Sequence, residues 1–165
     1  MNNRVRRITF IGVICAVAII LSYVEMLLPP IYAAVPGVKV GLPNIVIILV
    51  LYRYGVKSAA AVSLIRLIVT SALFGFSTTF FYSLAGAVLS LGVMALLKRT
   101  NAFSTVGVSI SGGVMHNLGQ IIVAILMLGT VEIGYYMFVL AISGTLAGIF
   151  IGIASSFLIA RLEKY

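Results

Sequence analysis

The sequence predicts an all-α integral membrane protein, a single domain over residues 1–165 built as a six-transmembrane-helix bundle. Of the 165 residues, 62% are hydrophobic and 8% are charged, a composition well outside the range of soluble globular domains. A helical span needs about 20 predominantly apolar residues, so about five to seven spans would use nearly the whole chain. The basic residues lie at the ends of the apolar runs, so the net charge of +8 indicates membrane orientation rather than nucleic-acid binding.

The expected helices follow from long apolar runs bounded by glycine, proline or charged residues. They cover approximately residues 8–28, 42–52, 58–74, 78–97, 104–128 and 134–160. The second is the weakest prediction, because a helix from Leu42 to Tyr52 rises only about 16 Å and the hydrocarbon core is about 30 Å thick. Either that helix begins earlier or its neighbours shield it.

The segment before this short helix, PPIYAAVPGVKVGLPN, contains four prolines and two glycines. Irregular backbone with apolar side chains is therefore expected there. The segment is either a plain connector or a loop that folds over an external pocket. In the second case, residues 29–40 would restrict the escape of a bound molecule.

The distribution of basic residues predicts the orientation. With the N-terminus in the cytoplasm, one basic residue, Lys39, falls in an external segment, and nine fall in cytoplasmic segments. Cytoplasmic segments of membrane proteins carry an excess of Lys and Arg. We therefore expect a multi-pass protein of the cytoplasmic membrane with both termini in the cytoplasm. The nine residues are Arg4, Arg6, Arg7, Arg53, Lys57, Lys98, Arg99, Arg161 and Lys164.

Small residues recur at four-residue spacing in the two terminal helices. Gly144, Gly148 and Gly152 lie on one face of the last helix, and Gly12 and Ala16 form a shorter version in the first. Such faces let another helix approach closely. They serve either packing inside the bundle or contact with a separate membrane subunit.

Arg66 lies in the middle of the apolar run AAVSLIRLIVTS. Its backbone is about 13 Å above the cytoplasmic boundary that Lys57 marks, which is near mid-membrane. A central arginine costs about 2.5–3.5 kcal/mol on translocon scales, so it normally faces the bundle interior, a partner or a wet cavity. Arg66 either serves a polar pocket or pairs with Glu25 to fix helix packing.

Further polar residues lie toward the external ends of the expected helices. His116 and Gln120 share one face of the fifth helix through their i,i+4 spacing. Asn117 lies beside them. Together these residues predict an outward-opening polar pocket of net positive character. The remaining candidates for this pocket are Glu25, Lys39, Asn44 and Tyr82.

Some of these residues have simpler interpretations. His116 is more readily a satisfied core histidine than a metal ligand, because the chain contains one histidine and one cysteine, Cys15. Tyr82 is readily explained by packing. We expect no metal and no cofactor.

A guanidinium offers five donors in a fixed geometry that suits planar or phosphate-like acceptors. Arg66 therefore predicts a small-molecule ligand with an anionic or electron-rich group. Asn44, His116, Asn117 and Gln120 would complete the polar lining, and Lys39 would lie at the mouth.

Several runs of the sequence resemble one family of small membrane proteins. They are PGVKVGLPNIVIILVLYRYG, the segment from Arg66 to the LFG at 73–75, SLAGAVLSLGVMALLK from Ser83, and GGVMHNLGQ from Gly112. Together they resemble heptaprenyl diphosphate synthase component I, also described as a Gx transporter family, over nearly the whole chain. These proteins are similar to the substrate-binding S components of energy-coupling factor (ECF) transporters.

The resemblance implies an S-component-like six-helix fold that captures a vitamin-like, flavin-like or prenylated molecule. It also implies a membrane T subunit and paired ATPase subunits as partners, with Gly12 and Ala16 matching the small-residue contact positions of S components. Two other functions remain open. One is a stand-alone secondary carrier, and the other is a non-catalytic accessory subunit of prenyl diphosphate or quinone biosynthesis.

We do not expect an enzyme. Prenyl diphosphate synthases hold magnesium with aspartate-rich motifs, because that ion prefers carboxylates. This chain contains no aspartate, and its glutamates are Glu25, Glu132 and Glu163. It also lacks a GxxxxGK[ST] phosphate-binding loop, so ATP hydrolysis would require another chain.

Overall fold

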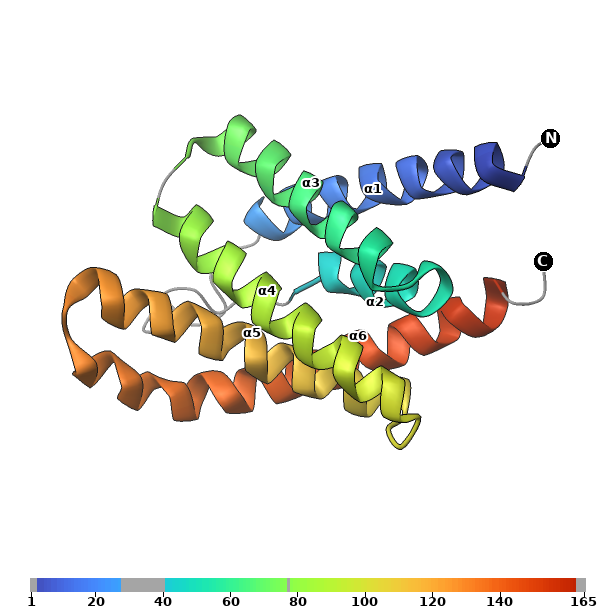
Figure 1. Cartoon of the computed structure of the whole chain (residues 1–165). Helices are drawn as coiled ribbons and strands as arrows, with labels where there is room; N and C mark the ends of the chain where they lie inside the picture. The colour runs from blue at the N-terminus through green and yellow to red at the C-terminus, as the bar shows by residue number, and fades with distance from the viewer. Residues whose placement is uncertain (1–2, 28–40, 77, 163–165) are drawn as a thin grey trace.

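The computed structural model describes residues 3–27, 41–76 and 78–162 (Figure 1). The described chain is helical, as predicted, and five helices are long and apolar enough to cross a membrane by length and composition. The helices are α1 (Asn3–Leu27), α2 (Pro43–Tyr54), α3 (Val56–Phe74), α4 (Thr78–Thr100), α5 (Thr105–Leu128), the 3₁₀ helix η1 (Val131–Tyr136) and α6 (Met137–Leu162).

The sixth helix differs from the prediction at its start. The expected range began at residue 134, but residues 131–136 form a 3₁₀ helix and α6 begins at Met137. Gly134 lies in this segment, and glycine is a weak former of α-helix. The preceding turn is set by Gly129, whose φ of 67° ends α5 in the left-handed conformation.

The short helix α2 begins at Pro43, so it does not start earlier than expected. Its 12 residues rise about 18 Å, which is less than the hydrocarbon core. Neighbouring helices shield it, because every side chain from Val46 to Leu51 is at most 4% exposed. It contacts α1, α3 and α6. Gly55, with a φ of 84°, ends α2 and leads directly into α3.

The most extensive contacts are those of α5 with α4 and with α6, and α1, α2 and α3 contact one another beside them (Figure 1). The start of α1 and the end of α6 lie at one end of the bundle, with the α2–α3 and α4–α5 connections (Figure 1). The α3–α4 and α5–α6 connections lie at the opposite end, which we call the far end. This alternation agrees with chain crossings in opposite directions.

Glycines bring α6 against α5. A Cβ atom placed on Gly148 would lie 2.5 Å from the Ile110 Cα, and one on Gly152 would lie 2.7 Å from the Val106 Cα. Gly144 meets the backbone of α5 in the same way. α5 therefore occupies this face inside the chain. The expectation of a partner contact at Gly144, Gly148 and Gly152 is corrected, because the backbone of α5 fills the position that a partner would take.

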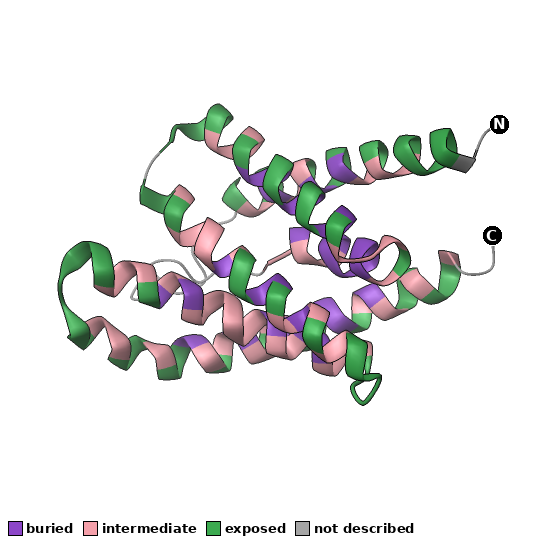
Figure 2. Cartoon of the chain, viewed as in Figure 1, coloured by how far each residue is buried: buried purple, intermediate pink, exposed green. Residues whose placement is uncertain are grey.

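The small-residue face of α1 is different. Gly12 and Ala16 are exposed, and a Cβ on Gly12 would meet no described atom within 4 Å. In Figure 2, exposed residues alternate with intermediate and buried ones along α1. Contact with a partner at Gly12 and Ala16 thus stays a prediction.

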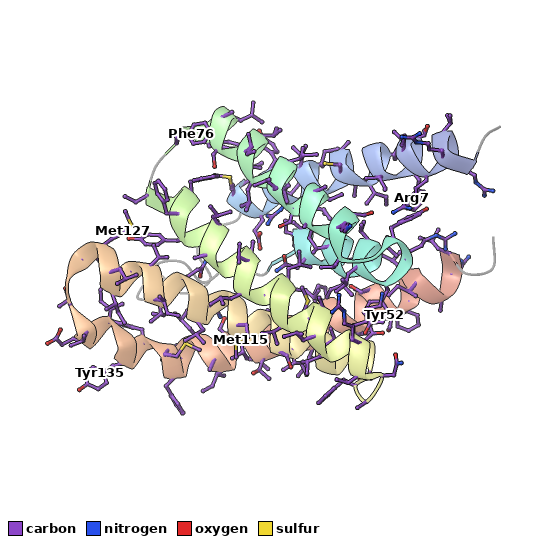
Figure 3. The ribbon with its side chains drawn as sticks, viewed as in Figure 1. Arg7, Tyr52, Phe76, Met115, Met127 and Tyr135 are labelled. Carbon is purple, nitrogen blue, oxygen red and sulfur yellow. The ribbon has the colours of Figure 1, made fainter. Side chains whose placement is uncertain are left out.

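On the side of the bundle where both termini lie, basic side chains donate hydrogen bonds to carbonyl oxygens near the C-terminus of α2. Lys98 Nζ donates to the carbonyl oxygens of Leu51 (2.7 Å) and Tyr52 (3.2 Å), close to the end of α2. Arg7, labelled with Tyr52 in Figure 3, donates to the Tyr54 carbonyl at 3.4 Å. Cations are stabilising at helix C-termini. Some of the basic residues that predicted the orientation therefore also hold α2 in place.

The close packing of α5 and α6 predicts unequal effects of alanine at two glycines. We expect Gly148→Ala to lower stability by about 1–3 kcal/mol, because the added methyl group meets backbone that cannot move aside cheaply. Gly12→Ala is the matched control, since its methyl group enters open space. Thermal unfolding of the two purified variants in one detergent measures the difference. Equal midpoints would show that the glycine contact is not tightly packed.

Candidate ligand-binding cavity

A polar cavity of about 90 Å³ lies between the helices, and all six α-helices contribute to its wall. This volume holds several water-sized groups. Apolar residues, including Leu67, Ala147 and Ile151, line the rest of it. The polar and charged residues of the wall are Ser22, Glu25, Asn44, Arg66, Thr70, Ser83, His116, Asn117 and Gln120.

Arg66 is the buried cation of this cavity. Its side chain is 9% exposed, and Nη1 donates to Ser22 Oγ at 3.2 Å. Ser22 in turn donates to the Ala18 carbonyl at 2.9 Å, which fixes its hydroxyl against α1. The Arg66 Nε is buried and has no hydrogen-bond partner among the described residues. Apart from the bond to Ser22, the described residues accept no hydrogen bond from this guanidinium, which lines the cavity.

The carboxylate of Glu25 holds the start of α2. Glu25 Oε1 accepts hydrogen bonds from the backbone N–H groups of Gly41 and Leu42, the second at 3.3 Å. Within the part of the chain that the structure describes, Glu25 accepts no hydrogen bond from Arg66. Glu25 therefore attaches the start of α2 to α1, and it also lines the cavity.

The turn before α2 positions Asn44. Gly41 has a φ of 79°, a backbone conformation that residues with a side chain rarely adopt. The backbone N–H of Asn44 donates to the Gly41 carbonyl oxygen at 2.8 Å. A Cβ on Gly41 would lie 3.2 Å from Asn44 Nδ2. The glycine therefore gives the Asn44 amide its place in the cavity wall.

The polar residues of α5 form the opposite wall. Gln120 Nε2 and His116 Nε2 are 3.4 Å apart, as their i,i+4 spacing allows. Asn117 Nδ2 donates to the Leu140 carbonyl of α6 at 2.6 Å. Part of the Asn117 amide consequently serves the contact between α5 and α6, in addition to lining the cavity.

The structure brings together six of the eight predicted binding residues: Glu25, Asn44, Arg66, His116, Asn117 and Gln120. Lys39, with the loop at residues 29–40, lies outside the described residues. Tyr82 is half-buried but does not line the cavity, whereas the next residue, Ser83, does. Successive helical residues point about 100° apart, which accounts for the difference.

Besides Ser83, two polar residues of the cavity, Ser22 and Thr70, were not among the predicted binding residues. Ser22 lies three residues before Glu25, and Thr70 lies four residues after Arg66. Residues at these spacings share a helix face. Helical spacing from the charged residues would therefore have identified both.

The fold and the cavity define a helical, multi-pass membrane protein with a buried polar cavity and a buried arginine in its wall. The chain belongs to the heptaprenyl diphosphate synthase component I family, whose sequence pattern matches residues 14–158. The matched range includes every described residue of the polar cavity. Comparisons with curated proteins and with solved structures gave no match.

The bonds of Glu25 predict how its substitution affects stability. Glu25→Ala should lower the free energy of unfolding by about 1–3 kcal/mol, because two backbone N–H groups lose their acceptor. Glu25→Gln keeps an acceptor oxygen and should lose clearly less. Thermal unfolding in detergent, combined with Arg66→Leu in a double-mutant cycle, measures both effects. A large loss in Glu25→Gln that Arg66→Leu rescues would instead identify a structural ion pair.

Proposed function

We propose that this chain is the substrate-binding membrane subunit of an ATP-driven uptake transporter, similar to an ECF S component. Its polar cavity binds a small molecule that carries an anionic group. Arg66 is the main ligand-binding residue, and Asn44, His116 and Gln120 provide further polar contacts.

The burial of Arg66 carries the proposal. A desolvated guanidinium is costly, and replacing a purely structural ion pair by apolar packing is often neutral or stabilising. Among the described residues, the Arg66 guanidinium has one hydrogen-bond partner, Ser22, and its buried Nε has none. An anionic ligand would supply the missing acceptors in a geometry that guanidinium matches well.

The source of energy would lie in other subunits. The sequence has no GxxxxGK[ST] loop, so a nucleotide-driven cycle needs separate ATPases and a membrane subunit that couples them to this chain. The exposed Gly12–Ala16 face of α1 is the contact proposed for that membrane subunit.

The description of the family favours a second candidate function. A component of a heptaprenyl diphosphate synthase would be an accessory membrane subunit that presents a substrate or product to a catalytic partner. The two functions differ in the proteins that accompany the chain: ATPases and a membrane subunit in one case, a prenyl-transferring enzyme in the other.

Ligand retention tests the role of Arg66. Native mass spectrometry of the detergent-solubilised protein should show a co-purifying small molecule in the wild type and its loss, by tenfold or more, in Arg66→Leu. Arg66→Lys should also bind poorly, because an ammonium cannot form the paired hydrogen bonds of a guanidinium. Arg99→Leu is the control, since Arg99 is an exposed arginine outside the cavity. Equal ligand occupancy in Arg66→Leu, with an unchanged thermal midpoint, would refute the assignment.

Recovery of partners tests the transporter role. Affinity purification of the wild type from its native membranes should yield a membrane subunit and ATPases, and Gly12→Leu should lower their yield at least tenfold. Gly92→Leu is the matched control, because Gly92 is an exposed helical glycine with open space around it on α4. Recovery of a prenyl-transferring enzyme instead would support the accessory function.

A further inference from the structure

A second cavity lies beside the polar cavity, toward the far end of the bundle. It has a volume of about 110 Å³, and residues of α1, α3 and α4 line it. We call it the far-end cavity. Met26, Leu67, Thr70 and Ser83 line both cavities, so the two are neighbours with a shared wall. The other residues of its wall are Ser71, Phe74, Gly75, Thr79 and Phe80.

The burial of α3 decreases from Arg66 toward the far end. Arg66 and Leu67 are 9% and 5% exposed, Thr70 and Ser71 have intermediate exposure, and Phe74, the last residue of α3, is 45% exposed. Figure 2 shows the ends of α3 and α4 at their connection mainly in the colour of exposed residues. Phe74 lies about 12 Å beyond Arg66 along the helix. The far-end cavity thus covers the distance from the buried guanidinium to the exposed end of α3.

Hydroxyl groups give the far-end cavity a polar wall. Those of Ser71, Thr79 and Ser83 make no hydrogen bond to a described residue, whereas Thr70 donates to the Arg66 carbonyl at 2.8 Å. A hydroxyl group without a partner is costly in apolar surroundings, and a cavity of this volume has room for water that supplies one. The wall therefore suits water or a hydrated ligand.

α3 and α4 leave space between them at the far-end cavity. Their contact is much less extensive than that of α4 with α5. The connection between the two helices passes through Gly75, where an added Cβ would meet no described atom within 4 Å. Packing of the described residues thus leaves this side of the cavity the more open one.

The far-end cavity leads to a cation. None of the described residues that line it is charged, and the charged residues of the adjoining polar cavity are Glu25 and Arg66. Glu25 Oε1 accepts hydrogen bonds from the backbone N–H groups of Gly41 and Leu42, which offset part of its negative charge. A cation at the inner end of a cleft with low-dielectric walls raises the local concentration of anions.

We propose that the far-end cavity is the hydrated entrance to the polar cavity, and that a water-soluble anion passes between α3 and α4 to reach Arg66. The hydroxyl groups of Ser71, Thr79 and Ser83 replace part of the water shell of the anion on its way. The inference rests on the proposed ligand site at Arg66, and it adds the route and the solubility class of the ligand.

Cysteine accessibility tests the entrance without knowledge of the ligand. Ser83→Cys is made in a Cys15→Ala background and studied in lipid nanodiscs, where both membrane surfaces are open to solvent. A methanethiosulfonate reagent that carries a sulfonate should modify Ser83→Cys at least tenfold faster than Phe81→Cys, because the reactive thiolate forms in water and not in lipid. Phe81 is the matched control, since it is 54% exposed, nearer the start of α4 and outside the cavity wall. Depth in the membrane alone would give the opposite order.

A second pair of variants repeats the comparison on α3. Ser71 lines the cavity, and its neighbour Ala72 is exposed but outside the wall. Ser71→Cys should react at least fivefold faster than Ala72→Cys, and this pair decides the matter if Ser83→Cys does not fold. Equal or reversed rates in a folded pair would overturn the entrance.

The charge of Arg66 should determine which reagents enter fastest. At Ser83→Cys, Arg66→Leu should lower the rate of the sulfonate reagent relative to that of its trimethylammonium analogue at least threefold. The ratio of the two rates removes any general change in access. An unchanged ratio would show that Arg66 attracts no anions through the entrance, and would overturn the inference.

The outcomes separate the entrance from the proposed function. Ligand that is retained by the wild type and lost in Arg66→Leu, together with unreactive Ser83→Cys and Ser71→Cys, would overturn the entrance and leave the proposed function standing. Reactive cysteines together with equal ligand occupancy in the wild type and Arg66→Leu would refute the ligand site and leave the hydrated entrance standing.

Discussion

The architecture depends on placing one permanent cation inside a membrane-spanning bundle. Arg66 is 9% exposed, and the one hydrogen bond of its guanidinium to a described residue goes to Ser22 of α1. A guanidinium in this position needs a polar environment, and the described helices provide one by leaving a cavity between them. The short helix α2 makes room for it, because this helix of 12 residues begins at Pro43, short of the far end. The turn at Gly41 then places Asn44 in the cavity wall, and Glu25 fastens this turn to α1.

The two sides of the bundle differ in how tightly they pack. Glycines on α6 and α5 bring the backbones of these helices into contact, and Gly119 of α5 would place a Cβ 2.7 Å from the Ala85 carbonyl oxygen of α4. Close backbone approach of this kind leaves little room for movement. The contact of α3 with α4 is looser. A closely packed wall of α5 residues thus faces a wall of α1, α3 and α4, in which α3 and α4 contact each other less extensively.

The sequence was sufficient to predict the helices and most of the cavity residues, because apolar run length and helical spacing depend on local composition. The burial of Arg66 was expected because the residue lies in the middle of an apolar helix. Other features depend on pairs of helices and could not be read from one run. The glycine face of α6 suited a partner and α5 equally well, and only the arrangement of the helices decides between them. Glu25 was a reasonable ion-pair partner for Arg66, but its carboxylate is used by the backbone of the α2 turn, which no spacing rule reveals.

The most direct measurement of the central claim observes the Arg66 Nε–H group itself. ¹⁵N-labelled arginine in the full chain, reconstituted in nanodiscs, gives an Nε–H resonance for each arginine, and Arg66→Lys assigns the one of interest. Addition of ethyl phosphate or propionate should shift this resonance as the Arg66 guanidinium gains an anionic acceptor, while the resonance of the exposed Arg99 stays in place. An unchanged Arg66 resonance at saturating concentrations of both anions would contradict the account.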